Sequence, residues 1–137
     1  MKAKELFIEL KVEMSKIKVS KNTTSKFNYD NYYEISTSKI TEIPNENIDK
    51  NILNDLKYRL DYYFKEYPVY DEDFENLIKN NTIYLGLIKK EPFHQQNVKM
   101  DGEITTFKEN DNYYCRLKKK HIKDKNSLCE YCIAKAL

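Results

Sequence analysis

The sequence is poor in the residues that build tight turns and extended, non-globular chains. Its 137 residues include two glycines and three prolines, which excludes a collagen-like or low-complexity architecture and disfavours an all-β sandwich. No apolar run exceeds about six residues, so the sequence predicts no transmembrane span. The opening residues, Met-Lys-Ala-Lys-Glu-Leu, are charged where a secretory signal peptide needs an apolar region. We therefore expect a cytoplasmic protein.

A strong excess of one charge sign is also missing. The 24 Lys and Arg nearly balance the 22 Asp and Glu, and a net charge of +2 argues against a protein that coats nucleic acid. Only two of the basic residues are arginine, whereas Lys, Asn, Ile and Tyr, whose codons are rich in A and T, are all common. Such a composition is typical of an A/T-rich genome, so the many Lys and Tyr do not by themselves indicate binding.

Helical periodicity dominates the first two thirds of the chain. Apolar residues recur every three or four positions over 4–17 and, most clearly, over 47–67. Asn47 is the candidate N-cap of the second helix, and Pro68 ends it because proline disfavours helix in the residue before it. Both segments therefore predict helices that bury one face.

Two other segments precede the change of pattern at Pro92. Acidic residues at 71–73 open a further helix, since acids are favoured at the positive end of a helix dipole, and Pro92 ends it. The stretch 29–35 fits a short helix or an extended segment equally well.

After Pro92 the apolar residues alternate, which predicts a β-hairpin of 103–108 and 113–117 around the turn residues 109–112. The residues after Cys132 favour a short terminal helix. The sequence thus predicts a mostly helical α+β protein with one domain over 1–137. Its helical part is 1–92, and a hairpin with a Cys/His module forms 93–137.

Every cysteine and histidine lies in that C-terminal third. Cys115, Cys129 and Cys132 fall within the last 23 residues, with His94 and His121 nearby. A Cys-x-x-Cys turn lets two sulfurs approach one ion, and a third thiolate and an imidazole complete a tetrahedral zinc site. Zinc is therefore the predicted cofactor, with either histidine as the fourth ligand. The expected role is a structural or interaction module.

Other uses of these cysteines remain open. They could be reduced, half-buried thiols, because free cysteine is often a core residue. The Cys-x-x-Cys motif could serve thiol redox chemistry, although it lacks the βαβ setting of thioredoxin-like proteins. A catalytic metal would make the protein a metalloenzyme. The sequence has no glycine-rich phosphate loop and no Ser/His/Asp arrangement, which favours a non-enzymatic role.

The one basic cluster lies between the hairpin and the Cys-x-x-Cys motif. Its lysines could contact a nucleic-acid backbone, although such a run is more often a solvated loop. They could also offset the net negative charge of a zinc ion bound by three thiolates. These lysines are Lys118, Lys119, Lys120, Lys123 and Lys125. A protein partner is possible, and no membrane partner is expected.

Three short stretches resemble one known family. They are Glu91-Pro-Phe-His94, Asn112-Tyr-Tyr-Cys115-Arg-Leu-Lys-Lys119 and Ser127-Leu-Cys129-Glu-Tyr-Cys132-Ile-Ala134. They resemble the C-terminal part of an uncharacterised archaeal family, catalogued as domain of unknown function 2115 and found mainly in methanogens. Lys4-Glu-Leu-Phe-Ile-Glu-Leu also resembles the first helix of that family.

The resemblance sharpens the predicted site. It implies that His94, Cys115, Cys129 and Cys132 are the ligands, and it gives no support to His121. The chain departs from the family where Arg116 replaces a proline and where 95–102 replaces a Gly/Pro-rich stretch. The family has no established activity, so the resemblance implies no reaction.

Overall fold

The computed structural model describes residues 1–100 and 103–137; residues 101–102, where the 95–102 segment ends, lie outside this part. The protein is α+β and mostly helical, as predicted. Its helices are α1 (Ala3–Ser15), α2 (Lys26–Thr37), η1 (Ile40–Glu42), α3 (Lys50–Glu66), α4 (Glu72–Tyr84), η2 (Leu85–Lys89), α5 (Lys118–His121) and η3 (Leu128–Tyr131). Its strands are β1 (Lys99–Met100), β2 (Glu103–Ile104), β3 (Thr106–Glu109), β4 (Asn112–Cys115) and β5 (Lys135–Ala136).

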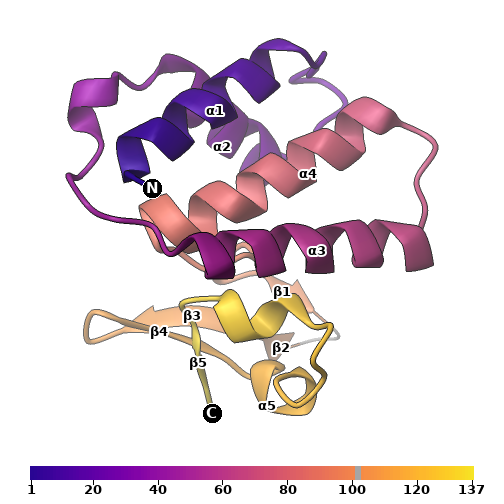
Figure 1. Ribbon diagram of the computed structural model, residues 1–137. Helices are drawn as coiled ribbons and strands as arrows, with labels where there is room; N and C mark the ends of the chain where they lie inside the picture. Colours follow the sequence, from indigo (N-terminus) through magenta and orange to yellow (C-terminus); the bar gives the residue numbers. More distant parts are fainter. Residues whose placement is uncertain (101–102) are drawn as a thin grey trace.

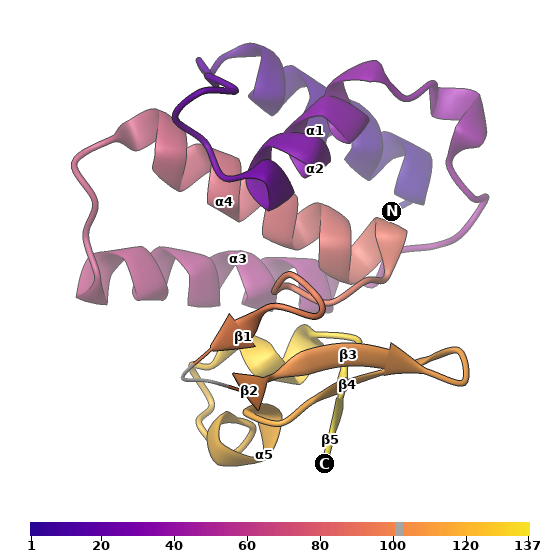
Figure 2. The same cartoon turned by 180° about the vertical axis from the view of Figure 1, so that it is seen from behind.

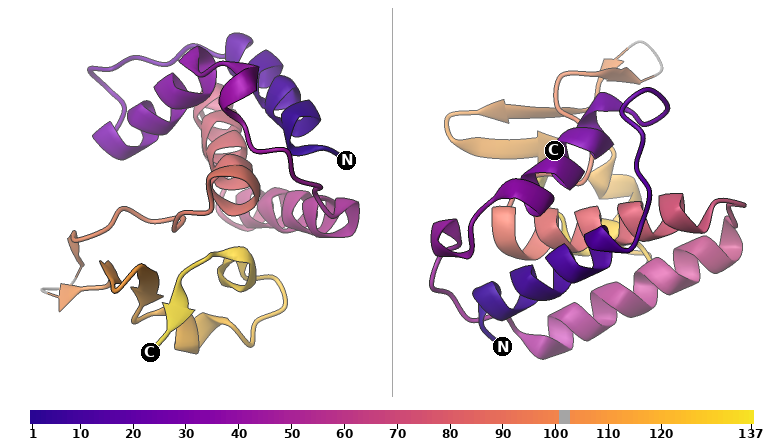
Figure 3. Two further views of the ribbon diagram at one scale, coloured as in Figure 1. Left: turned by 90° about the vertical axis from the view of Figure 1, so that its left-hand side faces the viewer. Right: turned by 90° about the horizontal axis from the view of Figure 1, so that it is seen from above.

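The long helices α1 to α4 form one layer, and the strands with α5 and η3 lie beneath it (Figure 1). The view from the side in Figure 3 separates the two layers, which the chain joins once, after η2. Across the described residues, no helix has the length and apolar character needed to cross a membrane.

The hydrophobic core lies within the helical layer. One face of each helix contributes to it: Leu6, Phe7, Leu10 and Met14 from α1, Ile35 from α2, Leu53, Leu56 and Leu60 from α3, and Leu77, Ile83 and Tyr84 from α4. Each large apolar side chain that becomes fully buried stabilises the fold by about 1.5–3 kcal/mol. The predicted helical stripes are confirmed as the origin of this core.

Helix α3 begins later than the sequence predicted. Asp49, not Asn47, is its N-cap, and the Asp49 carboxylate accepts a 2.8 Å hydrogen bond from the backbone N–H of Asn51. Asn47 instead pairs with Lys2 in an isolated antiparallel bridge that joins the start of the chain to the start of α3. The Asn47 prediction was wrong because this bridge keeps the backbone extended for two residues more.

Helix α4 begins at the predicted acidic residues, and the predicted end at Pro92 is approached only with the addition of η2, which ends at Lys89. The Asp71 carboxylate caps it by accepting hydrogen bonds from the N–H groups of Asp73 and Phe74, at 2.9 and 3.2 Å. Its last turn widens into the π-helical η2, which ends at Lys90 in a left-handed conformation, φ 57°. A π-turn inserts an extra residue into the helix and is frequent near functional sites.

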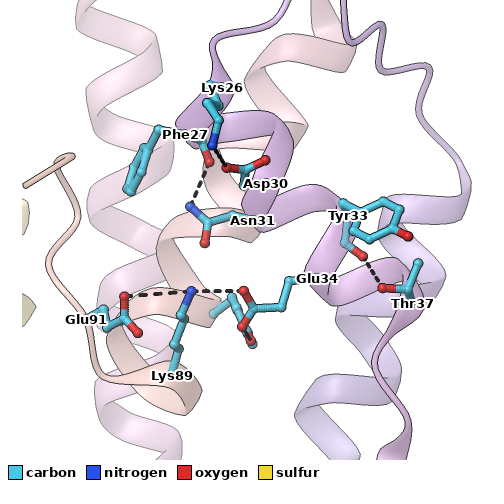
Figure 4. Close-up of polar contacts among 10 residues, drawn as sticks. Lys26, Phe27, Asp30, Asn31, Tyr33, Glu34, Thr37, Lys89 and Glu91 are labelled. Atoms are coloured by element: carbon cyan, nitrogen blue, oxygen red, sulfur yellow. Dashed lines mark hydrogen bonds and ion pairs between the residues drawn. The ribbon is translucent and has the colours of Figure 1, made fainter.

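The ambiguous segment 29–35 lies within helix α2. A polar cluster joins α2 to α4 and η2. Glu34 of α2 accepts hydrogen bonds from the Tyr84 hydroxyl of α4 at 2.5 Å and from the Lys89 ammonium of η2 at 2.9 Å. Figure 4 shows Lys89 between Glu34 and Glu91. Burial raises the pKa of Tyr84, and the carboxylate of Glu34 raises it further, so its hydroxyl remains a donor.

The predicted β-hairpin is confirmed with a shorter extent. Strand β3 pairs antiparallel with β4, with Thr106 opposite Cys115 and Phe107 opposite Tyr114 (Figure 2). Asn110 and Asp111 form the turn with φ values of 50° and 65°, which Asn and Asp tolerate better than most residues. The hairpin begins at 106 because Lys99 and Met100 of β1 pair with β2 instead.

The predicted terminal helix is wrong. After Cys132 the chain forms β5, which runs parallel to β4 with Ala136 beside Cys115. The open edge of β4 supplies hydrogen-bond partners, and this tertiary pairing overrides the helix propensity of the Ala-Lys-Ala-Leu end.

Candidate metal centre

A cleft of about 840 Å³ separates the helical layer from the C-terminal layer. It contains all four side chains that the family resemblance favoured as ligands: His94, Cys115, Cys129 and Cys132. His121 and Lys118 also line it. The four ligand candidates come from three separate segments of the chain, so the fold brings together residues that are up to 38 positions apart.

Strand pairing brings Cys115 and Cys132 near each other. Cys115 is the last residue of β4, and the register of β5 sets Ala136 beside it, four residues after Cys132. Between them, Ala134 is fully buried. Both side chains line the same cleft.

Cys129 lies in the short helix η3, whose geometry depends on Ser127. The Ser127 hydroxyl caps η3 by accepting a 3.1 Å hydrogen bond from the Cys129 N–H. At the other end, the Cys132 N–H donates to the Cys129 carbonyl at 3.2 Å. The Cys-x-x-Cys segment is therefore one tight turn.

His94 approaches this turn through its neighbour Phe93. The Phe93 backbone N–H donates to the Cys132 sulfur at 3.5 Å, and the Ala134 N–H donates to the same sulfur. Gly86 in the π-turn permits the approach, because a Cβ there would lie 3.0 Å from the Phe93 ring. The segment after Pro92 is thus held directly against the Cys-x-x-Cys turn.

Burial sets the protonation of two ligand candidates. It raises the pKa of the Cys132 thiol, and the two backbone N–H donors and the Lys118 ammonium offset only part of that rise. Desolvation by the surrounding chain also lowers the pKa of His94, although the residue as a whole is exposed. At neutral pH His94 is therefore neutral, which is the state that binds metals.

Lys118 is buried, contrary to its predicted place in a solvated basic run. Its ammonium donates to the carbonyls of Cys132 and Ala134, at 2.8 and 2.6 Å, so it holds the segment that follows the Cys-x-x-Cys turn. The other lysines of the run, Lys119, Lys120, Lys123 and Lys125, are exposed. Nucleic-acid contact through them stays a prediction, with one fewer cation available.

Arg59 is a site residue that the sequence reasoning missed. It lies on α3, where it is 7% exposed, and one guanidinium nitrogen donates to the Ser127 carbonyl at 2.8 Å. Another forms ion pairs with Asp55 at 3.0 Å and Glu130 at 2.9 Å. The sequence does contain a signal that singles out Arg59: it is one of only two arginines, and it follows Asp55 by four residues, the spacing of an ion pair on a helix.

Tyr131 completes this attachment of η3 to α3. Its ring lies under the Arg59 guanidinium, with 4.7 Å from the central carbon to the ring centroid, and its hydroxyl donates to Asp55. That hydrogen bond is the main reason why the pKa of Asp55 lies below its usual value, and it raises the pKa of Tyr131 to about 12. Asp55, Arg59, Glu130 and Tyr131 together form what we call the η3 clamp.

Over residues 1–100 and 103–137, no three His, Cys, Asp or Glu side chains stand in positions that could hold a metal ion. The described cysteines are free thiols and all three are partly exposed. Any metal binding therefore requires their side chains to turn towards a common point.

The architecture defines a class: a mostly helical α+β protein whose small C-terminal layer carries three cysteines and a histidine that line one cleft. Residues 3–137 match the family described as an uncharacterised protein conserved in archaea (DUF2115). The chain is 31% identical over 161 residues to UPF0305 protein MJ0646 of Methanocaldococcus jannaschii, covering 100% of this chain and 98% of that protein. A UPF0305 protein of Methanothermobacter thermautotrophicus is 30% identical over 61 residues, which cover 44% of this chain and 37% of that protein.

The chain belongs to this archaeal family, and the resemblance seen in the sequence is confirmed. No solved structure matches it.

Proposed function

We propose that the protein binds one Zn²⁺ through Cys115, Cys129, Cys132 and His94, and that the ion holds the C-terminal layer together. The observation that carries the proposal is that these four side chains, from three segments, line one cleft. Two thiols from one tight turn, a third from a neighbouring strand and a neutral imidazole are the ligand set of a closed structural zinc site. Zinc would make the layer an interaction module whose stability depends on the metal.

The surroundings of Cys132 support a metal rather than a redox role. Two backbone N–H groups donate to its sulfur, and such donors orient and stabilise metal-bound thiolates. Without a metal, burial keeps the thiol protonated, which makes it a poor nucleophile for disulfide exchange. The buried Lys118 ammonium would offset the negative charge that three thiolates and one Zn²⁺ leave.

The C-terminal layer has a small apolar interior, so a bound zinc ion would contribute to its stability. Beyond position 93, Ala134 is the one apolar side chain among the described residues that is fully buried; Thr105, Thr106 and Lys118 are the buried polar ones. So little apolar burial stabilises a layer weakly, and small modules of this kind depend on metals or other cross-links.

Metal analysis tests the proposal on the purified protein. We expect about one Zn²⁺ per chain, and a ligand held at ~100 times its dissociation constant adds about 2.7 kcal/mol to the unfolding free energy. Thiol labelling should detect none of the three cysteines before chelation and all three after it. A metal-free protein with all three thiols reactive and a melt indifferent to zinc would overturn the proposal.

Ligand variants separate this site from its alternatives. Cys115→Ser and His94→Ala should each weaken zinc binding by at least about 100-fold, because removing even a hydrogen-bond partner of a ligand costs about 10–100-fold. His121→Ala is the matched control, since His121 also lines the cleft. Loss of zinc in His121→Ala and not in His94→Ala would contradict the assignment of the fourth ligand. A Cys129–Cys132 disulfide that forms reversibly and ignores Cys115 would establish the redox alternative.

A further inference from the structure

One face of the β3–β4–β5 sheet carries two aromatic rings on the side opposite to the proposed zinc site. Thr106 and Cys115, which lie opposite each other in the register, line the cleft, so the alternation of side chains places Phe107 and Tyr114 on the other face. The centroids of these two rings are 5.7 Å apart, with 30° between the ring planes. Both residues are partly exposed. The sheet therefore presents two neighbouring rings away from the cleft.

Two exposed cations flank the rings on the same face. The guanidinium of Arg116 lies over the Phe107 ring, with 5.4 Å from its central carbon to the ring centroid. Lys135 of β5 is paired with Tyr114, so its side chain leaves the sheet on the same side. Within the described residues neither cation forms a salt bridge. Among the described strand residues of this sheet, Glu109 next to the turn is the one carboxylate on this face.

The small net charge of the whole chain conceals an asymmetry along it. Residues 1–92 contain 15 Lys and Arg against 16 Asp and Glu, whereas residues 93–137 contain nine against six. A polyanion that approaches the sheet therefore meets the positive part of the protein. Further exposed lysines follow Arg116 along the chain: Lys119, Lys120, Lys123 and Lys125.

We propose that Phe107, Tyr114, Arg116 and Lys135, which we call the sheet platform, bind single-stranded nucleic acid. Unpaired bases stack on aromatic rings and on guanidinium planes, and cations beside the rings contact the phosphates. A duplex has its bases already stacked, so it would reach the cations alone. An acidic peptide would also contact the cations but has no flat group to stack on the rings. The platform uses none of the four zinc-ligand candidates, so the proposal goes beyond the metal site.

Fluorescence anisotropy of a labelled oligonucleotide tests the proposal on the full-length protein as purified. A thymidine homopolymer of about 12 nucleotides is a suitable probe, because single-strand sites commonly span about 4–16 nucleotides and thymidine does not pair with itself. The uridine homopolymer of the same length distinguishes RNA from DNA as the preferred strand. A duplex of the same length measures binding by charge alone. We expect the single strands to bind more tightly than the duplex, although the duplex carries more phosphate.

Variants of the platform separate stacking from charge. Tyr114→Ala should weaken the binding of either single strand about tenfold, because it removes one base-stacking ring. Tyr113→Ala is the matched control and should leave the affinity unchanged, since Tyr113 is the preceding residue of β4 and lies on the other face, beside Lys108. Arg116→Gln should reduce the slope of log affinity against log salt by about 0.7, the contribution of one phosphate contact on a single strand. Glu109→Gln should strengthen binding, because it removes the carboxylate from this face.

Three results would overturn the proposal. The first is that neither single strand binds at low salt. The second is that Tyr114→Ala and Tyr113→Ala weaken binding equally, and the third is that inorganic polyphosphate of equal charge displaces the probe as well as the unlabelled strand does, because stacking then plays no part. Circular dichroism checks that each variant folds. Should Tyr114→Ala fail to fold, the polyphosphate competition on the wild type still tests stacking, and an unchanged salt slope in both Arg116→Gln and Lys135→Gln would also refute the platform.

Discussion

The η3 clamp makes a strong quantitative prediction about Arg59. Arg59→Met keeps most of the apolar stem and removes the guanidinium, which holds the Ser127 carbonyl, two carboxylates and the Tyr131 ring. Leu128 and Tyr131 of η3 also pack against the helical core, so this substitution tests how much the cation adds to the attachment of η3 to α3.

The magnitude follows from the exposure of each partner. The hydrogen bond from a charged donor to the Ser127 carbonyl contributes about 1.5 kcal/mol or more. The carboxylates of Asp55 and Glu130 are 40% and 49% exposed, so both ion pairs are screened by solvent and contribute little. Stacking on Tyr131 adds about 0.5–1 kcal/mol. Against these gains, Arg59 Nε is buried without a partner, which costs about 1 kcal/mol.

We therefore expect Arg59→Met to lower the unfolding free energy by about 2 kcal/mol, or the melting temperature by roughly 7 °C. Urea unfolding measures the first quantity and calorimetry the second. Arg116→Met is the matched control, because the Arg116 side chain is exposed and its substitution should cost less than about 0.5 kcal/mol. Equal stability of the Arg59 variant and the wild type would refute the attachment that we describe.

Three further substitutions test other contacts of the site. Lys118→Met should lower the unfolding free energy by about 2–3 kcal/mol in urea unfolding, because two buried carbonyls lose their donor. Gly86→Ala should change stability by less than about 1 kcal/mol, since the gain in helix propensity offsets the crowding of Phe93, but zinc titration should show weaker binding as Phe93 shifts. Tyr131→Phe should be less stable than wild type between the ordinary pKa values of Asp55, 3.8, and Tyr131, 10.0, with the difference shrinking outside that window.

The sign of the pH effect follows from the two pKa shifts. The pKa of Asp55 is lowered in the folded state, so its contribution is present above 3.8 and is lost as the pH falls through the folded value. The pKa of Tyr131 is raised to about 12, so its contribution is present below 10.0 and is lost as the pH rises through about 12. Melts of the wild type and of Tyr131→Phe at acidic, neutral and alkaline pH measure this difference in stability, and a pH-independent difference would contradict the hydrogen bond.

The control for Lys118→Met is Lys119→Met, because Lys119 is exposed. Equal effects of the two substitutions on the unfolding free energy would contradict the buried contacts of Lys118.

The helical layer could be predicted from the sequence because burial there follows a short period. The stripe that contains Leu53, Leu56 and Leu60 repeats every three or four residues, and a helix that buries it needs no information from distant parts of the chain. The cap of α3 could not be placed in this way. Asn47 is an acceptable cap locally, but its pairing with Lys2 is a contact across 45 positions.

The C-terminal layer was predictable only in part for the same reason. The Asn-Asp turn and the alternating residues around it are local signals, and they predicted the hairpin. Strand β5 carries no local signal, because its residues favour helix and its pairing with β4 is decided by an open strand edge. Clustering of Cys and His marked the cleft, whereas the hydrogen bond from Arg59 to the Ser127 carbonyl spans 68 positions and has no local pattern that predicts it.

Two buried cations explain how a layer with so little apolar interior keeps a defined Cys-x-x-Cys turn. Arg59 approaches from the helical layer and binds the carbonyl before the turn, at Ser127; Lys118 approaches from the other side and binds the carbonyls of Cys132 and Ala134. Both cations act on the backbone, so the turn is positioned whichever way the thiols point. Rotation of the thiols towards an ion would then leave the backbone unchanged. Because the turn is already ordered, little of the free energy of zinc binding would be lost to ordering the chain, and most of it would stabilise the cross-link.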